Sequence, residues 1–160
     1  MKRLLCTLLL LLLLPWVSHA ATVTNTQGTI ATWHTGSATL ASNSTVTSSV
    51  ITLASGVGYL KAACEFFMPA PSGTPAANTN VAVWFLLKPD GSNLEDAASP
   101  RLPDFTFPLA AIAGAQRIVQ REILLPAQNG FQVVIKNNGT GVTIQTTWTL
   151  KCVPYTPQVQ

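Results

Sequence analysis

Tyr59–Met68, with the sequence YLKAACEFFM, decides the fold class, because apolar and polar side chains alternate along most of its length. Alternation with a period of two is typical of a β-strand that buries one face. The even-numbered positions from Leu60 to Met68 form the apolar face. Asn80–Lys88 is apolar on both faces, and this pattern predicts a central strand.

Short strands and turns account for most of the remaining chain. Val142–Cys152 alternates most clearly and is predicted to be the last long strand. Leu109–Ala115 is rich in alanine and compatible with a short helical turn. The pattern predicts an all-β fold, an antiparallel, jelly-roll-like β-sandwich of about eight strands. The other expected strands are Thr29–His34, Ser37–Ala41, Thr47–Leu53, Phe105–Phe107, Gln116–Leu125 and Phe131–Lys136.

The first twenty residues have the three parts of a secretory signal peptide. Lys2 and Arg3 precede an apolar run over 4–14, Pro15 ends this run, and Ala20 suits the peptidase. An uncleaved anchor is the alternative, but about 20 apolar residues are needed to span a membrane. We therefore expect a secreted or periplasmic protein that no membrane holds after cleavage. Residues 21–45 are predicted to be a Thr/Ser-rich arm or edge strands, 46–155 the sandwich domain and 156–160 a tail.

Two cysteines, Cys64 and Cys152, stay in the chain when Cys6 leaves with the leader. In an oxidising compartment two cysteines usually pair. Each lies on the apolar face of a clear strand, where a core-spanning or a cross-strand disulfide would need it. The alternative is a pair of free buried thiols.

Charged residues make up only 9% of the chain and hydrophobic residues 48%, which excludes a charge-rich disordered protein. Without Lys2 and Arg3, seven basic residues accompany six acidic ones. A net charge so close to zero, without a basic cluster, argues against partners such as nucleic acid or an anionic membrane surface.

The residue types give little support for a metal site, and no cofactor is expected. The two cysteines lack the Cys-x-x-Cys spacing of zinc sites. One acidic turn is a weak calcium candidate, although a solvated turn is the main interpretation. Its oxygen ligands would be Asp90, Asn93, Glu95 and Asp96.

Catalytic groups are also sparse. His34 is the sole histidine after the leader, and no Gly-x-Ser-x-Gly motif accompanies it. A Ser-His-Asp triad therefore has no local support, and we expect a protein that is not an enzyme. The alternative, a small extracellular hydrolase, would need two carboxylates in one cleft. The candidate carboxylates are Glu65, Glu95, Asp96 and Glu122.

Aromatic rings are the candidate ligand-binding groups, because exposed rings stack on the C–H surfaces of sugars. Trp84 and Trp148 lie on apolar strands and are predicted to be core residues. Trp33 and Tyr59 are the candidates for a glycan-binding site, which would require them to be exposed beside the loops.

A series of short motifs runs along the carboxy-terminal half. They are Pro89–Asp96 (PDGSNLED), Phe107-Pro108-Leu109, Ala115-Gln116-Arg117, Ile123–Pro126 (ILLP), Val134–Gly141 (VIKNNGTG), Thr149-Leu150-Lys151 and Pro154-Tyr155. In this order they resemble a group of small, mostly uncharacterised β-sandwich proteins of tailed bacteriophages and prophages, found among virion and tail genes. The resemblance implies a β-sandwich with a structural role, and no catalytic residues.

These observations together predict a non-enzymatic, exported β-sandwich that acts as a structural or surface-presenting module, like a phage virion component. Uncharged strand edges can pair between subunits, so a homo-oligomer, or virion and surface proteins, are the expected partners. A secreted module that binds a glycan or a cell surface is the first alternative, and the hydrolase is the second.

Overall fold

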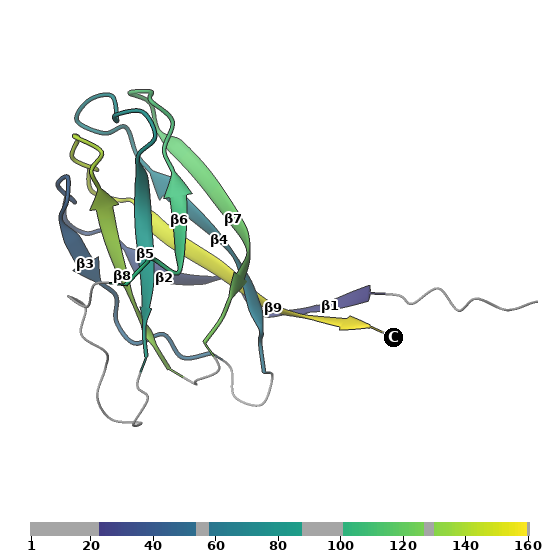
Figure 1. Ribbon diagram of the computed structural model, residues 1–160. Helices are drawn as coiled ribbons and strands as arrows, with labels where there is room; N and C mark the ends of the chain where they lie inside the picture. The colour runs from purple at the N-terminus through teal and green to yellow at the C-terminus, as the bar shows by residue number, and fades with distance from the viewer. Residues whose placement is uncertain (1–22, 54–57, 88–100, 127–129, 160) are drawn as a thin grey trace, which may run out of the picture.

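The computed structural model describes residues 23–53, 58–87, 101–126 and 130–159 (Figure 1). This part of the chain is all-β and contains no helix. Its strands are β1 (Val23–Gln27), β2 (Ala31–Thr35), β3 (Thr45–Thr47), β4 (Lys61–Met68), β5 (Asn80–Leu86), β6 (Phe105–Pro108), β7 (Gln116–Leu124), β8 (Gln132–Asn138) and β9 (Thr149–Val159).

The strands form two antiparallel sheets that pack face to face. One sheet has the order β1-β9-β4-β7, and β2 also pairs with β9. The other has the order β3-β8-β5-β6 (Figure 1). Rings from both sheets meet between them, and Phe66 of β4 stacks on Phe107 of β6 with 5.4 Å between centroids. The predicted antiparallel β-sandwich is confirmed.

Two strands carry the patterns that decided the fold. In β4 burial alternates without interruption, and the even-numbered side chains from Ala62 to Met68 lie in the core. β5 is buried at nearly every position, as expected for a strand between β8 and β6. Trp148 is a core residue as predicted, but the prediction for Trp84 is wrong. Trp84 is half-buried, because alternation turns it away from the face that Val83 gives to the core.

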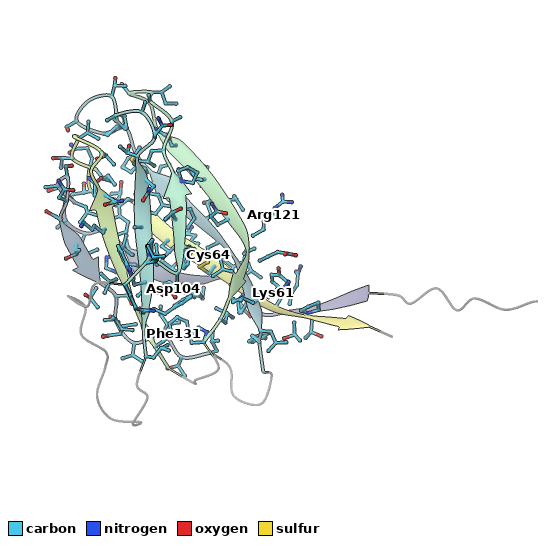
Figure 2. All side chains as sticks on the ribbon, viewed as in Figure 1. Lys61, Cys64, Asp104, Arg121 and Phe131 are labelled. Carbon is cyan, nitrogen blue, oxygen red and sulfur yellow. A yellow bond between two sulfur atoms is a disulfide. The ribbon has the colours of Figure 1, made fainter. Side chains whose placement is uncertain are left out.

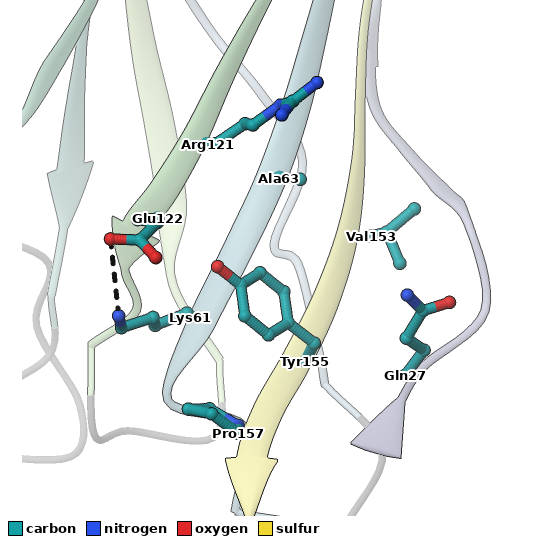
Figure 3. A pocket seen from close by; sticks show the side chains of 8 residues that line it. All are labelled: Gln27, Lys61, Ala63, Arg121, Glu122, Val153, Tyr155 and Pro157. Carbon is teal, nitrogen blue, oxygen red and sulfur yellow. Dashed lines mark ion pairs between the residues drawn. The ribbon is translucent and has the colours of Figure 1, made fainter. Parts of the chain in front are cut away.

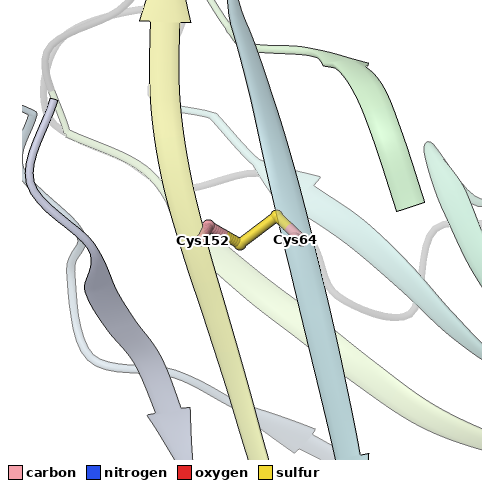
Figure 4. The surroundings of a disulfide bond; sticks show 2 residues. All are labelled: Cys64 and Cys152. Carbon is pink, nitrogen blue, oxygen red and sulfur yellow. A yellow bond between two sulfur atoms is a disulfide. The ribbon is translucent and has the colours of Figure 1, made fainter. Parts of the chain in front are cut away.

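The predicted disulfide between Cys64 and Cys152 is present (Figure 4). It is the cross-strand form, because the two residues lie directly opposite each other on the neighbouring strands β4 and β9, with 4.1 Å between their Cα atoms. Both side chains are buried. The bond closes a loop of 88 residues, which stabilises the fold by about 4–5 kcal/mol in the chain-entropy model.

β9 begins and ends later than predicted. Val142–Cys152 was expected to be one strand, but β9 starts at Thr149. A turn precedes it, in which Thr147 has a φ of 72°, in the left-handed region that β-branched residues rarely adopt. At its other end β9 runs to Val159 and so includes residues that were expected to form a tail.

β1 and the end of β9 form a two-stranded ribbon that extends away from the sandwich (Figure 1). Val23–Gln27 pairs with residues 155–159. Gly28 then donates its N–H to the Pro154 carbonyl at 2.8 Å, and the chain continues as β2 along the same neighbour, β9. β1 and β2, both from the Thr/Ser-rich region, therefore lie at a sheet edge.

Several expected elements are shorter than predicted. Ser37–Ala41 contributes only the bridge of Leu40 to Ile144, and Thr47–Leu53 only the end of β3 and the bridge of Ile51 to Phe131. Residues 109–115 contain no helical turn. The Gln116 side chain holds this segment in a non-helical form. Its Oε1 accepts the N–H of Ala110 and its Nε2 donates to the Ala110 carbonyl, both at 2.9 Å.

Candidate functional site

A β-bulge in β7 directs two successive charged side chains to the same face of the sheet. Between β4 and β7 the register shifts, because Ala62 pairs with Ile123 whereas Cys64 pairs with Gln120. Arg121 and Glu122 therefore lie opposite the single residue Ala63, and both are exposed. Bulges of this kind often lie beside functional sites.

The bulge requires an unfavourable backbone conformation. Glu122 has a φ of 59°, in the left-handed region, which costs a non-glycine residue about 1–3 kcal/mol. A regular strand would avoid this cost but would turn one of the two charged side chains toward the core. The left-handed conformation of Glu122 thus accompanies the exposure of two successive side chains, Arg121 and Glu122, on the outer face of the sheet.

The bulge borders a groove of about 630 Å³ on the outer face of the five-stranded sheet (Figure 3). Arg121 and Lys61 lie toward this face, whereas Cys64 lies inside the sandwich (Figure 2). The groove crosses β1, β9, β4 and β7. Its lining residues are Gln27, Lys61, Ala63, Arg121, Glu122, Val153, Tyr155 and Pro157.

Register places the polar groups of the groove side by side. Tyr155 of β9 lies directly opposite Lys61 of β4 on one side and Gln27 of β1 on the other. In the same way Ala63 lies opposite Val153, and these two small side chains leave room between the polar groups. Figure 3 shows the Tyr155 ring between Lys61 and Gln27. The groove thus combines one aromatic ring, an amide and three charged groups.

The charges of the groove are only partly paired. Lys61 Nζ lies 3.6 Å from Glu122 Oε2, and the Glu122 side chain is 72% exposed, so this ion pair is weak. Within the described part of the chain, Arg121 makes no hydrogen bond or ion pair. Two cations and one carboxylate leave the groove with a positive excess.

Arg117 lies four residues before Arg121 on the same strand, but its contacts differ from those of Arg121. Its Nη1 lies 2.7 Å from Glu65 Oε1, and its guanidinium lies over the Phe67 ring, 4.4 Å from the centroid. Arg117 is therefore held by its own neighbours. Arg121 is exposed and has no such contacts within the described residues.

Neither aromatic residue selected from the sequence lies in this groove. Trp33 is only 4% exposed, and its ring packs edge-on against Phe131 with 5.4 Å between centroids. This ring face is not available as a sugar platform, so the exposure expected of Trp33 is corrected. Tyr59 is half-buried and packs against Gly28, where a Cβ atom would lie 2.8 Å from the Tyr59 hydroxyl.

The other candidate residues do not form a site in the described structure. The calcium candidates Asp90, Asn93, Glu95 and Asp96 lie outside the described residues, as does the predicted signal peptide. Over residues 23–53, 58–87, 101–126 and 130–159, no group of three or more His, Cys, Asp or Glu side chains could hold a metal. Those residues also include no helix that is long and apolar enough to cross a membrane.

The two described carboxylates of the hydrolase alternative each lie beside a basic side chain, and His34 packs against an aromatic ring. Glu65 pairs with Arg117, and Glu122 pairs with Lys61. His34 stacks on Trp148, with 4.9 Å between the ring centroids, and burial lowers the pKa of its imidazole.

Sequence reasoning missed Lys61, Arg121 and Tyr155, although one signal for them exists. In β7 the buried positions change from even to odd numbers, from Gln116 to Ile123. Such a change of parity within one strand indicates a bulge.

Comparisons with known proteins add no function. No family model matches the chain, and no curated protein matches it. The crystal structure of FlhE is 12% identical, with a TM-score of 0.36, over 85% of this chain and 96% of that one. A structure of the Gx strain of infectious bursal disease virus is also 12% identical, with a TM-score of 0.32. It matches over 88% of this chain and 32% of the viral chain.

Proposed function

We propose that this protein is an exported, non-enzymatic module that acts by presenting a binding surface, the outer face of its five-stranded sheet. The observation that carries this proposal is the strained bulge that exposes Arg121 and Glu122 beside one groove. Backbone strain of this kind clusters at functional sites in proteins. A buried disulfide supports export, because such bonds form in oxidising compartments.

The groove is suited to a saccharide that carries a carboxylate or sulfate group. The Tyr155 ring offers an apolar surface for the C–H face of a sugar, and Gln27 and Glu122 offer hydrogen-bonding groups for hydroxyls. Arg121 and Lys61 supply the positive charge, and a guanidinium binds a carboxylate with two parallel hydrogen bonds. The ligand class of this module is therefore an acidic glycan of a cell surface.

Binding of the mature protein to an array of neutral and acidic glycans tests this function. Wild type is expected to retain acidic glycans, and Arg121→Gln to lose about tenfold or more in affinity. Tyr155→Ala should also lose binding, with its melting temperature measured to confirm folding. Lys151→Gln is the matched control, because it removes an exposed cation from β9 outside the groove. A folded wild type that binds no glycan, or variants that bind as well as wild type, would overturn the proposal.

A structural role like that of a phage virion component is the second candidate. It is favoured by the ribbon of β1 with residues 155–159, which reaches beyond the sandwich and offers backbone groups to a neighbouring protein (Figure 1). A mature protein that forms a stable assembly and binds no glycan would favour this role over glycan recognition.

A further inference from the structure

The charges of the groove on the outer face of the five-stranded sheet fall into two separate groups. Lys61 and Glu122 form an ion pair, with Nζ 3.6 Å from Oε2, so their charges cancel. Arg121 has no hydrogen bond or ion pair with any residue that the structure describes. Figure 3 shows the ion pair to one side of the Tyr155 ring and Arg121 apart from it. The groove therefore has one uncompensated cation, which matches one anionic group on a ligand.

Fold stability does not account for a glutamate at the bulge. Glu122 has a φ of 59°, and glycine adopts this left-handed conformation without the steric cost that other residues have. Glycine is also the usual left-handed residue of β-bulges. The ion pair with Lys61 offsets little of this cost, because the Glu122 side chain is 72% exposed. The carboxylate is therefore better explained by what the groove binds.

A carboxylate beside two cations selects among acidic ligands. An anionic group that comes close to Glu122 is repelled, and such repulsion excludes the wrong partner. A second anion could bind Lys61 only in competition with Glu122. A ligand carboxylate at Arg121 meets no such competitor, and its two oxygens match the fork of the guanidinium. Uncharged hydroxyls can still accept from Lys61 and donate to Glu122.

We propose that Glu122 is a specificity-determining residue, which restricts the groove to saccharides with a single carboxylate and excludes those with an additional sulfate group. The ligand carboxylate binds Arg121. An uncharged part of the same saccharide lies against the Tyr155 ring, beside the pair that Lys61 forms with Glu122. This inference rests on the proposed function, because it concerns which acidic glycan the same groove takes.

The unsulfated chondroitin disaccharide and its monosulfated form are a matched pair of probes, because they share one carboxylate and differ only in the sulfate. NMR titration of the mature protein at constant ionic strength measures both dissociation constants. Wild type is expected to bind the unsulfated form about tenfold more tightly. Glu122→Gln keeps an acceptor oxygen but loses the charge, and it should bring the two affinities within about twofold of each other.

Glu65→Gln is the matched control for charge. It removes the same charge from the same face of the sheet, but Glu65 pairs with Arg117 and does not line the groove. This variant should keep the wild-type preference for the unsulfated disaccharide.

Glu122→Gly separates a role in binding from a role in folding. It should melt no lower than wild type, because glycine relieves the left-handed strain, and it should lose the preference for the unsulfated form. A clear fall in its melting temperature would show that the glutamate serves the fold, and this result would overturn the inference.

The remaining outcomes separate this inference from the proposed function. Equal affinity of wild type for the two disaccharides, or a preference that Glu122→Gln leaves unchanged, would overturn the inference while the groove remained a glycan site. Binding of neither disaccharide would also overturn it. If no acidic glycan of the array bound either, the proposed function would fail with it.

Discussion

The sandwich has two lateral sides, where an outer strand of one sheet lies beside an outer strand of the other sheet. The space between the sheets is closed to different degrees on these two sides. On the β6–β7 side, Gln120 of β7 donates its amide Nε2 to the Thr106 carbonyl of β6 at 2.8 Å and so links the two sheets. On the β2–β3 side, the corresponding space is a groove that Trp33 helps to line. The buried indole Nε1–H of Trp33 has no acceptor among the described residues.

Side chains also complete the strand edge on the β6–β7 side. β6 pairs with β5 only from Asn80 to Val83. Further along, the Phe85 N–H donates to Asp104 Oδ2 at 2.7 Å, and Arg101 donates to the Phe85 carbonyl. The molecule therefore satisfies one side from within its own chain. The difference teaches that hydrogen bonds from side chains, and not strand pairing alone, close a side of this sandwich.

The largest expected effect lies on neither side, because the disulfide joins the central strands β4 and β9. Cys64→Ser should lower the free energy of unfolding by about 2–5 kcal/mol, since it frees a long loop in the unfolded chain. Chemical denaturation measures this loss. Cys64→Ser with Cys152→Ser should lose the same amount, because both variants lack one bond. Equal melting temperatures with and without reductant would contradict the prediction.

Gly36→Ala is expected to have the next largest effect, on the β2–β3 side. Gly36 is buried, and a Cβ atom there would overlap the Trp148 indole. The backbone cannot move away easily, because the Gly36 N–H donates to the Trp148 carbonyl at 2.8 Å. The expected cost is about 1–3 kcal/mol or more in thermal or denaturant unfolding.

Gly114→Ala is the control for Gly36→Ala, because nothing lies within 4 Å of a Cβ atom at that position. It should leave the melting temperature close to that of wild type or raise it slightly. If both alanine variants melted like wild type, Trp148 would not be fixed against Gly36.

Asp104→Ala removes side-chain hydrogen bonds from the β6–β7 side. The two sides then become more alike, because each has a buried N–H without an acceptor. It removes the acceptor of the Phe85 N–H and one of the partners of Arg101. An unsatisfied buried N–H costs about 1–3 kcal/mol, which denaturant unfolding would detect. Asp104→Asn retains an acceptor oxygen and should lose less. If Asp104→Ala were as stable as wild type, water would replace the carboxylate at no cost, and the contrast between the two sides would be smaller than the hydrogen bonds indicate.

Much of the fold is predictable because it depends on side-chain alternation. The patterns of β4 and β5 predict two strands within a residue or two of their bounds, and the cysteine positions predict the disulfide. The start of β9 is not predictable in this way. Thr147 is β-branched, yet it occupies a left-handed turn that ends the extended backbone after Val142 and Ile144 have alternated correctly.

The candidate site is harder to predict, because it depends on register between strands far apart in the sequence. Nothing local shows that Tyr155 will lie beside Lys61, or that Arg121 and Glu122 will both oppose Ala63. The aromatic residues chosen from the sequence failed for a related reason. Trp33 lies at the register shift of β2 against β9, because Thr32 pairs with Lys151 and His34 with Leu150, and nothing local in the sequence shows this shift.

The smallest predicted effect is a pH dependence that arises from His34 on the β2–β3 side. Burial lowers the pKa of His34 below its ordinary value, so between the two values the unfolded chain binds more protons than the folded one. Stability is then full above the unfolded pKa and decreases as the pH falls toward the folded one. The melting temperature should fall slightly between about pH 7.5 and about pH 5.5, and His34→Gln should flatten this slope. After the predicted leader there is no other histidine, so an unchanged slope in His34→Gln would show that the stacked imidazole on Trp148 titrates normally.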